Sequence, residues 1–375
     1  MMRISDLSGI SFALILATAL VACGIVSNET ADVGEMSRHT IEHQGLEREY
    51  FIYLPPGYES GGELPVVFFL HGFGGTATGS EAETTNGLNR YAANYGYVMV
   101  YPQGAWFMSD GSSGERWEVT SWNFVSGTLD EGPEGPLCAP DAVKYPCPPD
   151  CGDCSRCAWT SCRDDLGFLE KLFETVATDL NVNRDRYYLS GFSNGSMMTQ
   201  YVGCMASNWL AAVALVGGRI VRGYQCAPTK ALPVLQVNGA RDEVVPNDGR
   251  VSADGYFYAS TNATKLEWNK GTGCTTEPEP WSNEMTENHG LQCSATCAGT
   301  NQESIDCLWP DGDHHWPGYP AGHGTDGYCV SALQQASMPE QTLCVEPDTD
   351  VDVWGSRLMF DFFDSHKQQE YGDDT

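Results

Sequence analysis

A serine lies between two glycines in Gly191-Phe192-Ser193-Asn194-Gly195. The β-prone run 186–190 precedes this pentapeptide, and residues 196–202 after it are typical of a helix. A serine at such a strand-to-helix turn is the pattern of a nucleophile elbow, in which glycines let strand and helix approach closely and the hydroxyl stands clear of the sheet. A glycine-rich turn with a solvated serine is the alternative, so the elbow needs partner residues elsewhere in the chain.

Two residues further along the chain could serve as those partners. A serine hydroxyl becomes a nucleophile when a base lies within hydrogen-bond distance and a third group orients that base. Asp242 comes shortly after the apolar run 232–237, and His314 lies in the tight loop 309–318. The order Ser193, Asp242, His314 is that of an α/β-hydrolase triad, with a nucleophile, an orienting acid and a general base.

Other interpretations of these residues stay open. An aspartate after a strand is often a turn or cap residue. The acids Asp248, Asp311 and Asp313 are rivals, although none directly ends an apolar strand. His314 and the adjacent His315 could also form a surface loop or a weak metal site. Because no third ligand follows at close spacing, we expect no metal and favour the triad.

An attacked ester also needs hydrogen-bond donors for the negative charge that forms on its oxygen. The segment His71-Gly72-Phe73-Gly74-Gly75 follows the apolar run 64–70 and resembles an oxyanion loop. We expect the backbone N–H of Phe73 or Gly74 to act together with that of Asn194. A plain glycine turn is the alternative, and His71 is expected to be structural and not a second base.

Apolar runs predict the elements that must position these residues. Strand-like and helix-like stretches alternate, which indicates an α/β fold with a mainly parallel sheet covered by helices on both faces. Sites in such folds lie at the carboxyl ends of the strands, where the candidate residues fall. We expect strands at 50–54, 64–70, 97–101, 186–190, 210–216 and 232–237, and helices at 88–95, 164–180 and 351–366.

Six segments resemble one family in sequence and order, namely 64–75, 97–104, 121–124, 164–168, 191–198 and 312–318. It is the polyhydroxybutyrate depolymerase and feruloyl esterase family, which overlaps carbohydrate esterase family one. The resemblance covers roughly residues 43–366 and implies an α/β-hydrolase fold, the triad Ser193, Asp242 and His314, and no cofactor. At His315 and Asp313 the family more often has threonine and glycine, and between the two histidines we favour His314.

A cysteine-rich insert at residues 125–163 interrupts the alternation of strands and helices. The spacing of Cys151, Cys154 and Cys157 resembles iron–sulfur or zinc runs. In an exported protein three disulfides are the better interpretation, since the insert lacks the apolar residues for a core of its own. We hypothesise that it forms a lid or wall of the acyl pocket. Its six cysteines are Cys138, Cys147, Cys151, Cys154, Cys157 and Cys162.

The N-terminus has the features of an export signal. The apolar run 10–22 follows Arg3 and is short for a membrane span. Leu20-Val21-Ala22-Cys23-Gly24 resembles the lipobox of bacterial lipoproteins, in which the cysteine is acylated; a secretory signal without lipid is the alternative. We expect a signal in residues 1–23, a flexible tether in 24–39, a catalytic domain in 40–368 and an acidic tail in 369–375.

The cysteine count agrees with export. The chain has 15 cysteines, and assigning Cys23 to a lipid leaves 14, enough for seven disulfides in an oxidising compartment. By resemblance, Cys204 with Cys226 and Cys274 with Cys307 are plausible pairs; the other pairings are not determined by sequence.

Composition limits the partners. With 50 acidic and 20 basic residues the net charge is −30, which disfavours nucleic acid and anionic lipid headgroups. We therefore expect a monomer that contacts a membrane only through its lipid. Trp122 and Trp316 could stack on a sugar or an aromatic acyl group, or be core residues, and with His315 they are the candidate substrate pocket.

Together these features predict an exported serine esterase that acts through an acyl-enzyme. The substrate we favour is a feruloyl or acetyl ester on plant cell-wall polysaccharide, with polyhydroxybutyrate-type polyester as the alternative. A catalytically inactive, surface-anchored binding protein on a hydrolase scaffold and a metal-binding surface protein are alternatives of other classes.

Overall fold

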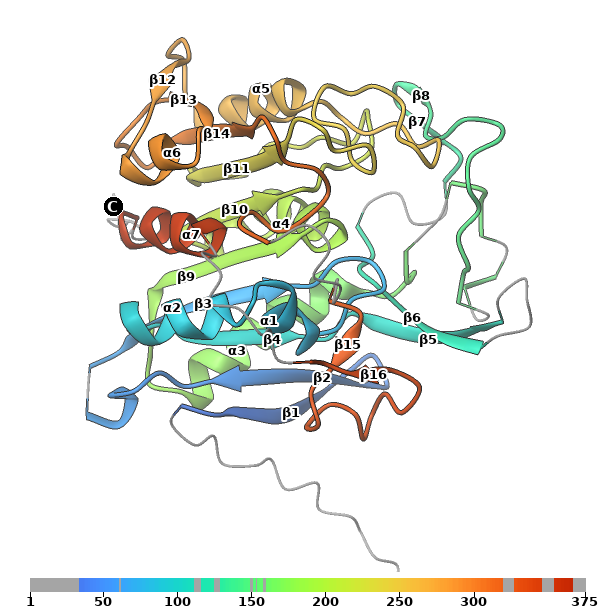
Figure 1. Cartoon of the computed structure of the whole chain (residues 1–375), viewed down its shortest axis with the longest axis vertical. Coiled ribbons are helices and arrows are strands. Elements are labelled where there is room, and N and C mark those ends of the chain that lie inside the picture. The colour runs from blue at the N-terminus through green and yellow to red at the C-terminus, as the bar shows by residue number, and fades with distance from the viewer. Residues whose placement is uncertain are drawn as a thin grey trace, which may run out of the picture.

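Ten strands form the central sheet, in the order β1-β2-β4-β3-β9-β10-β11-β14-β13-β12 (Figure 1). The computed structural model describes residues 34–60, 62–110, 116–124, 129–148, 151–152, 154–157, 160–319, 327–345 and 354–366. The middle strands from β4 to β14 are parallel, and antiparallel strands complete both edges. The strands are β1 (Met36–His43), β2 (Leu46–Tyr53), β3 (Leu64–Leu70), β4 (Val98–Pro102), β9 (Val182–Phe192), β10 (Ala212–Val216), β11 (Val234–Gly239), β12 (Glu279–Trp281), β13 (Gln292–Thr296) and β14 (Ser304–Trp309).

Strand β3 shows why the central strands are apolar at every position. Val66 and Phe68 lie in the core on one face of the sheet, and Val67 and Phe69 lie in the core on the other face. Successive side chains of a strand point to opposite faces. A strand that is covered on both sides therefore needs an apolar residue at each position.

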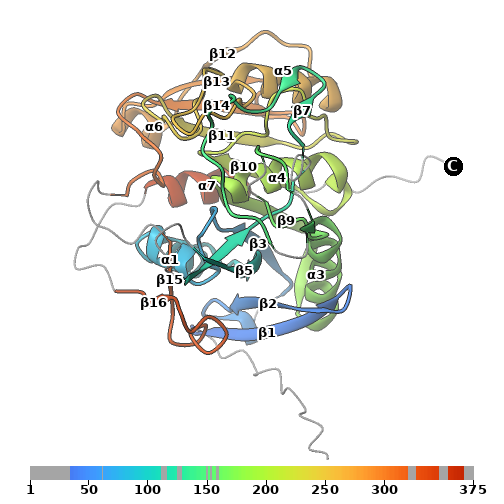
Figure 2. The ribbon, with the colours of Figure 1, turned by 90° about the vertical axis from the view of Figure 1, so that its right-hand side faces the viewer.

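Helices cover both faces of the sheet. Residues of α3 (Asp165–Asp179), α4 (Asn194–Met205) and α5 (Thr261–Thr272) pack in the first core, and residues of α2 (Gly87–Tyr95) and α7 (Trp354–Asp364) pack in the second. Figure 2 shows α1 (Gly79–Glu83) and α7 on one side of the sheet and α3 and α4 on the other. The predicted α/β-hydrolase architecture is confirmed. The short α6 (Glu284–Asn288) precedes β13.

The fold begins earlier than the sequence indicated. Residues 24–39 were expected to be a flexible tether, but β1 starts at Met36 and pairs with β2 in antiparallel register from Met36 opposite Tyr53 to His43 opposite Leu46. This strand lies at the sheet edge and most of its side chains are partly exposed. An edge strand of this kind tolerates polar residues. The sequence of β1 therefore has no apolar pattern that would indicate a strand.

Seven disulfides join 14 cysteines, and the insert contains three of them, Cys138–Cys157, Cys147–Cys154 and Cys151–Cys162. The prediction of three disulfides in the insert is confirmed. Sulfur atoms of Cys147, Cys151 and Cys154 lie within 4.8 Å of one another, but each belongs to a disulfide. A disulfide leaves no thiolate to bind a metal.

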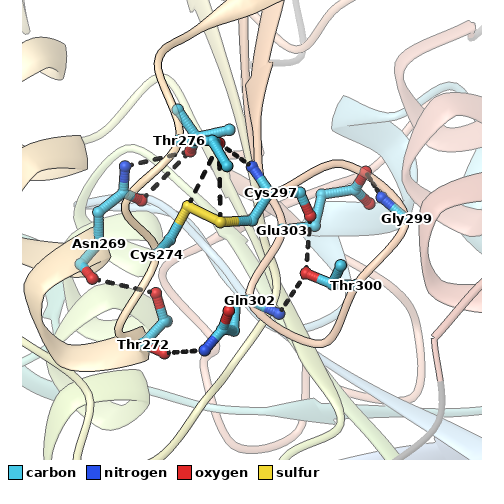
Figure 3. Close-up of a disulfide and its surroundings, with 10 residues drawn as sticks. Asn269, Thr272, Cys274, Thr276, Cys297, Gly299, Thr300, Gln302 and Glu303 are labelled. Carbon is cyan, nitrogen blue, oxygen red and sulfur yellow. Dashed lines mark hydrogen bonds between the residues drawn. A yellow bond between two sulfur atoms is a disulfide. The ribbon is translucent and has the colours of Figure 1, made fainter.

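Outside the insert, one expected pairing is confirmed and one is wrong. Cys204 pairs with Cys226, whereas Cys274 pairs with Cys297 and not with Cys307 (Figure 3). Cys307 on β14 lies directly opposite Cys293 on β13, with a Cα–Cα distance of 4.1 Å, and bonds to it. The antiparallel register between β13 and β14 therefore decides the pairing. The seventh disulfide is Cys329–Cys344.

The hairpin of β5 (Ala105–Asp110) and β6 (Arg116–Ser121) separates β4 from the insert. Beyond this hairpin the insert packs on the chain that follows β11, through a bridge between Cys138 and Tyr256 and a hydrogen bond from the Ala139 N–H to the Gly255 carbonyl. In the parts of the chain that the structure describes, no helix is long and apolar enough to span a membrane.

Candidate active site

Ser193 occupies a strained turn between β9 and α4. Its backbone has φ 53° and ψ −117°, and such a positive φ is rare for a residue with a side chain and concentrates at functional sites. Glycine is required at the two flanking positions because a side chain at either one would clash with the backbone nearby. A Cβ atom on Gly195 would lie 2.0 Å from the Leu70 carbonyl oxygen, and one on Gly191 would lie 2.6 Å from the carbonyl carbon of Gly195.

Ser193, His314 and Asp242 form one hydrogen-bonded chain. His314 Nε2 lies 2.9 Å from Ser193 Oγ, and His314 Nδ1 lies 2.7 Å from Asp242 Oδ2. The other carboxylate oxygen, Asp242 Oδ1, accepts the N–H groups of Val244 and Val245, each at 2.8 Å. Because the carboxylate is buried and held by three donors, it fixes the imidazole with Nδ1–H toward Asp242 and the Nε2 lone pair toward the serine.

Two adjacent parallel strands bring the acid and the histidine together. Gly239 at the end of β11 lies opposite Trp309 at the end of β14. The loops that follow are joined, because the Arg241 N–H donates to the Gly312 carbonyl at 2.8 Å. A Cβ atom on Gly239 would lie 2.5 Å from the carbonyl oxygens of Gly312 and Asp313. The absence of a side chain at residue 239 therefore lets the two loops meet.

The rival acids and the second histidine have other partners. Asp248 pairs with Arg250, Asp311 pairs with Arg241, and Asp313 pairs with His315. The His315 ring also stacks on Tyr319, with ring centroids 5.9 Å apart and an angle of 3° between the planes. The described contacts thus join His314, and not His315, to Ser193 and Asp242.

Backbone hydrogen bonds distinguish the two N–H groups, of Phe73 and Gly74, that were proposed as oxyanion donors in this loop. The Gly74 N–H donates to the Thr120 carbonyl at 2.9 Å and so points away from the serine, which makes the expectation for Gly74 wrong. Phe73 lines the same cavity as Ser193. Asn194 is held in place because its Oδ1 accepts the Trp122 N–H at 2.7 Å. Phe73 and Asn194 remain the proposed donors.

His71 is a buried neutral imidazole. Its Nε2 accepts the Gly104 N–H at 2.9 Å and its Nδ1 donates to the Gly72 carbonyl at 2.7 Å. Burial lowers the pKa of His71 to about 4. Both ring nitrogens are engaged and neither contacts the serine, so the contacts are those of a structural residue.

This imidazole makes stability depend on pH. A histidine in the unfolded chain has a pKa near 6.5, above that of folded His71. The unfolded state therefore binds a proton first as the pH falls, and stability that is complete above pH 7 is lost between pH 6.5 and pH 4. We expect this residue to remove about 2 kcal/mol of unfolding free energy between pH 7.5 and pH 5.

Urea unfolding of wild type and His71→Gln at the two pH values measures this contribution. The variant should be less stable at pH 7.5, because it loses the fitted ring, but it should lose about 2 kcal/mol less on acidification. An equal loss in both proteins would contradict the assignment of a neutral buried ring.

A cavity of about 100 Å³ opens at Ser193. Two of the residues predicted for the substrate pocket, His315 and Trp316, line it, although the Trp316 side chain is buried and its Nε1 donates to Ser356 Oγ. Trp122 is wrong as a pocket residue, because it is not among the residues that line this cavity; its side chain is buried and its Nε1 donates to the His71 carbonyl. Other residues that no sequence pattern indicated also line the cavity, namely Glu83, Phe192, Tyr319 and Tyr328.

The insert reaches the site through one aromatic contact. Tyr145 packs edge-on against Phe73 with ring centroids 5.2 Å apart, and its hydroxyl donates to Asp254 at 2.5 Å. Among the described residues none from the insert lines the cavity itself. The insert therefore supports the wall of the cavity from behind. Cys23, the proposed lipidation site, lies outside the described residues.

Comparison with known proteins finds esterases. The family model Esterase, described as "Putative esterase", matches residues 42–135. Feruloyl esterase B of Piromyces equi is 28% identical over 254 residues, which are 64% of this chain and 39% of that protein. "Putative esterase NocK" of Nocardia uniformis subsp. tsuyamanensis is 26% identical over 73% of this chain and 72% of its own length. The chain thus spans less than half of the first relative.

A solved structure, "Acetyl xylan esterase from Aspergillus awamori", is also similar. The match has a TM-score of 0.46 and 14% identity, and it covers 75% of this chain and 94% of that one.

Proposed function

We propose that this chain, an α/β-hydrolase of the feruloyl esterase family, hydrolyses carboxylic esters of plant cell-wall polysaccharide through an acyl-enzyme on Ser193. The observation that carries the proposal is the hydrogen-bonded chain from Ser193 through His314 to buried Asp242, at a strained elbow beside a cavity. This is the geometry that a serine nucleophile needs. It disfavours a catalytically inactive binding protein on the same scaffold.

The contacts support the following path for the proton. His314 Nε2 accepts the hydroxyl proton as Ser193 Oγ attacks the ester carbonyl carbon, and Asp242 stabilises the imidazolium that forms. The N–H groups of Phe73 and Asn194 would receive the negative charge on the carbonyl oxygen. The proton then passes to the departing alcohol. Water repeats the sequence on the acyl-enzyme and releases the carboxylic acid.

The substrate class follows from the relatives and the cavity. The name of the relative Feruloyl esterase B contains the feruloyl group, and we favour this group or the smaller acetyl group. The cavity of about 100 Å³ is smaller than a cavity of about 150 Å³ that takes up benzene. An acetyl group fits within it, whereas the ring of a feruloyl group needs space beyond it. A polyester of the polyhydroxybutyrate type is the alternative substrate for the same chemistry.

A panel of substrates tests the proposal. Purified protein is offered p-nitrophenyl acetate, acetylated xylan, methyl ferulate and polyhydroxybutyrate, and release of nitrophenol, acetate, ferulate and hydroxybutyrate is measured. We expect hydrolysis of p-nitrophenyl acetate together with acetylated xylan or methyl ferulate. Release of hydroxybutyrate alone would favour the polyester, and no hydrolysis of any ester would contradict the proposal.

Location follows in part from the disulfides. Seven disulfides are typical of proteins outside the cytosol, and the protein is extracellular. We further propose that Cys23 carries a lipid that anchors it to the cell envelope, because its sequence context resembles a lipobox. Labelling with radioactive palmitate that persists in Cys23→Ser would refute the anchor at this residue.

A further inference from the structure

A buried arginine follows β10, close to the nucleophile elbow. Arg219 comes three residues after Val216, the last residue of β10, and its side chain is fully buried. Burial lowers the pKa of Arg219 to about 10, while Asp306 and Asp242 attract its charge, so the guanidinium is charged at neutral pH. Because burying a charged group is costly, an arginine in the interior points to a role for its side chain.

One end of the Arg219 side chain supports the elbow. Nη1 donates to the Gly218 carbonyl, which also accepts the Ser196 hydroxyl at 3.3 Å. Gly218 packs directly against the turn, since a Cβ atom on it would lie 2.1 Å from the Ser193 carbonyl oxygen. The Ser193 N–H donates to the Val216 carbonyl at 3.0 Å. The segment that follows β10 therefore holds the backbone of the nucleophile in place.

The other end of the side chain reaches the start of α5. Nη2 donates to Thr261 Oγ1 at 3.2 Å, and this oxygen also accepts the side-chain N–H of Asn238 at 3.4 Å. The Thr261 N–H donates to the Asn247 carbonyl at 2.8 Å. Asn238 precedes Asp242 by four residues and Asn247 follows it by five. Thr261 is thus bonded to the chain on both sides of the triad acid.

The guanidinium therefore links the support of the nucleophile to the support of the acid. Its plane is rigid and the separation of its two terminal nitrogens is fixed. Ser193 and Asp242 lie on different loops, and His314 bonds to both, at 2.9 Å and 2.7 Å. A misplacement of catalytic groups by about 1 Å can cost about 100-fold in rate. A link of fixed length between the two loops is therefore useful to the triad.

We propose that Arg219 is a positioning residue, which sets the separation between the nucleophile elbow and the loop of the triad acid through the two hydrogen bonds of its guanidinium. The inference rests on the proposed function. Arg219 is not among the residues that line the cavity at Ser193. Its loss should therefore lower kcat and leave KM nearly unchanged.

Two identical substitutions on α5 test the link, Thr261→Val and Thr264→Val. Both threonines are buried, and valine removes the hydroxyl with little change in shape. Thr261 Oγ1 accepts the bond from Arg219, whereas Thr264 Oγ1 has no hydrogen-bond partner among the described residues. With p-nitrophenyl acetate, Thr261→Val should lower kcat about tenfold, as for one bond from a charged donor, with KM within about threefold. Thr264→Val should leave both constants within about twofold of wild type.

Arg219→Met removes both hydrogen bonds together with the charge, and kcat should fall about 10- to 100-fold. Lys265→Met is the matched control. Lys265 is likewise buried and its charge also acts on Asp306, but the described hydrogen bonds of Gly218 and Thr261 do not include it. Urea unfolding should show a loss of stability in both variants, whereas kcat of Lys265→Met should stay within about threefold of wild type.

Arg219→Lys distinguishes the link from a simple effect of charge. Lysine keeps the positive charge but lacks the planar fork that reaches two acceptors. Its kcat should stay at least about threefold below that of wild type, because one of the two bonds is lost. Full recovery of kcat in Arg219→Lys would assign the effect to charge and overturn the proposed link.

Equal kcat values in Thr261→Val and Thr264→Val, or in Arg219→Met and Lys265→Met, would also overturn the positioning role. If Arg219→Met does not fold, the two threonine variants decide, since each loses a single hydroxyl. Failure of wild type to hydrolyse p-nitrophenyl acetate would instead contradict the proposed function.

Discussion

Ser193→Ala is expected to lower kcat for p-nitrophenyl acetate by about 10⁵- to 10⁶-fold. The change removes the hydroxyl oxygen that lies 2.9 Å from His314 Nε2. Oxyanion donors and binding alone leave a small residual rate in such enzymes. Initial rates at saturating substrate, with the enzyme concentration raised for the variant, measure the loss.

Ser190→Ala is the matched control for this experiment. Ser190 is buried in β9, three residues before Ser193, and its hydroxyl donates to the Ala214 carbonyl at 3.0 Å. Its replacement removes one hydrogen bond and should leave kcat within about threefold of wild type. Activity that survives Ser193→Ala in a correctly folded protein would exclude the serine as nucleophile.

The second large expected effect distinguishes the catalytic roles of the adjacent His314 and His315. His314→Gln is expected to lower kcat by about 10⁵-fold or more, because glutamine cannot accept the serine proton and return it to the alcohol. His315→Gln should retain kcat within about tenfold. The imidazole of His315 binds Asp313 and stacks on Tyr319 at the cavity wall, so its loss should act mainly on KM.

The same assay with both variants decides between the histidines, and circular dichroism confirms that each is folded. An inactive His315→Gln beside an active His314→Gln would transfer the role of base to His315. It would also require a rearrangement of the loop that now directs His314 toward Asp242.

The chemistry of the site could be predicted from sequence because two of the three triad residues follow conspicuous apolar strands. Ser193 follows β9 and Asp242 follows β11, and parallel strands bring their carboxyl ends to one edge of the sheet. His314 follows β14, a strand that the sequence did not indicate, since Asp306 interrupts its apolar pattern. The tight loop with two histidines was the signal there.

Features that depend on backbone direction or on side-chain packing could not be predicted. Gly74 and Phe73 are neighbours in a glycine-rich loop, and only the bond from Gly74 to Thr120 distinguishes their N–H groups. The disulfide partner of Cys307 could be identified only from the register between β13 and β14. Glu83 had no sequence signal, because a lone glutamate in a short helix looks like a solvated surface residue.

The contact between Tyr145 and Phe73 links one wall of the cavity to the disulfides of the insert. Three disulfides close the insert that carries Tyr145, and they form only in an oxidising compartment. A chain that folds in the cytosol would build its sheet and triad while the support behind Phe73 stayed loose. Under the proposed function, the placement of Phe73 would then depend on oxidation of the insert as well as on collapse of the core.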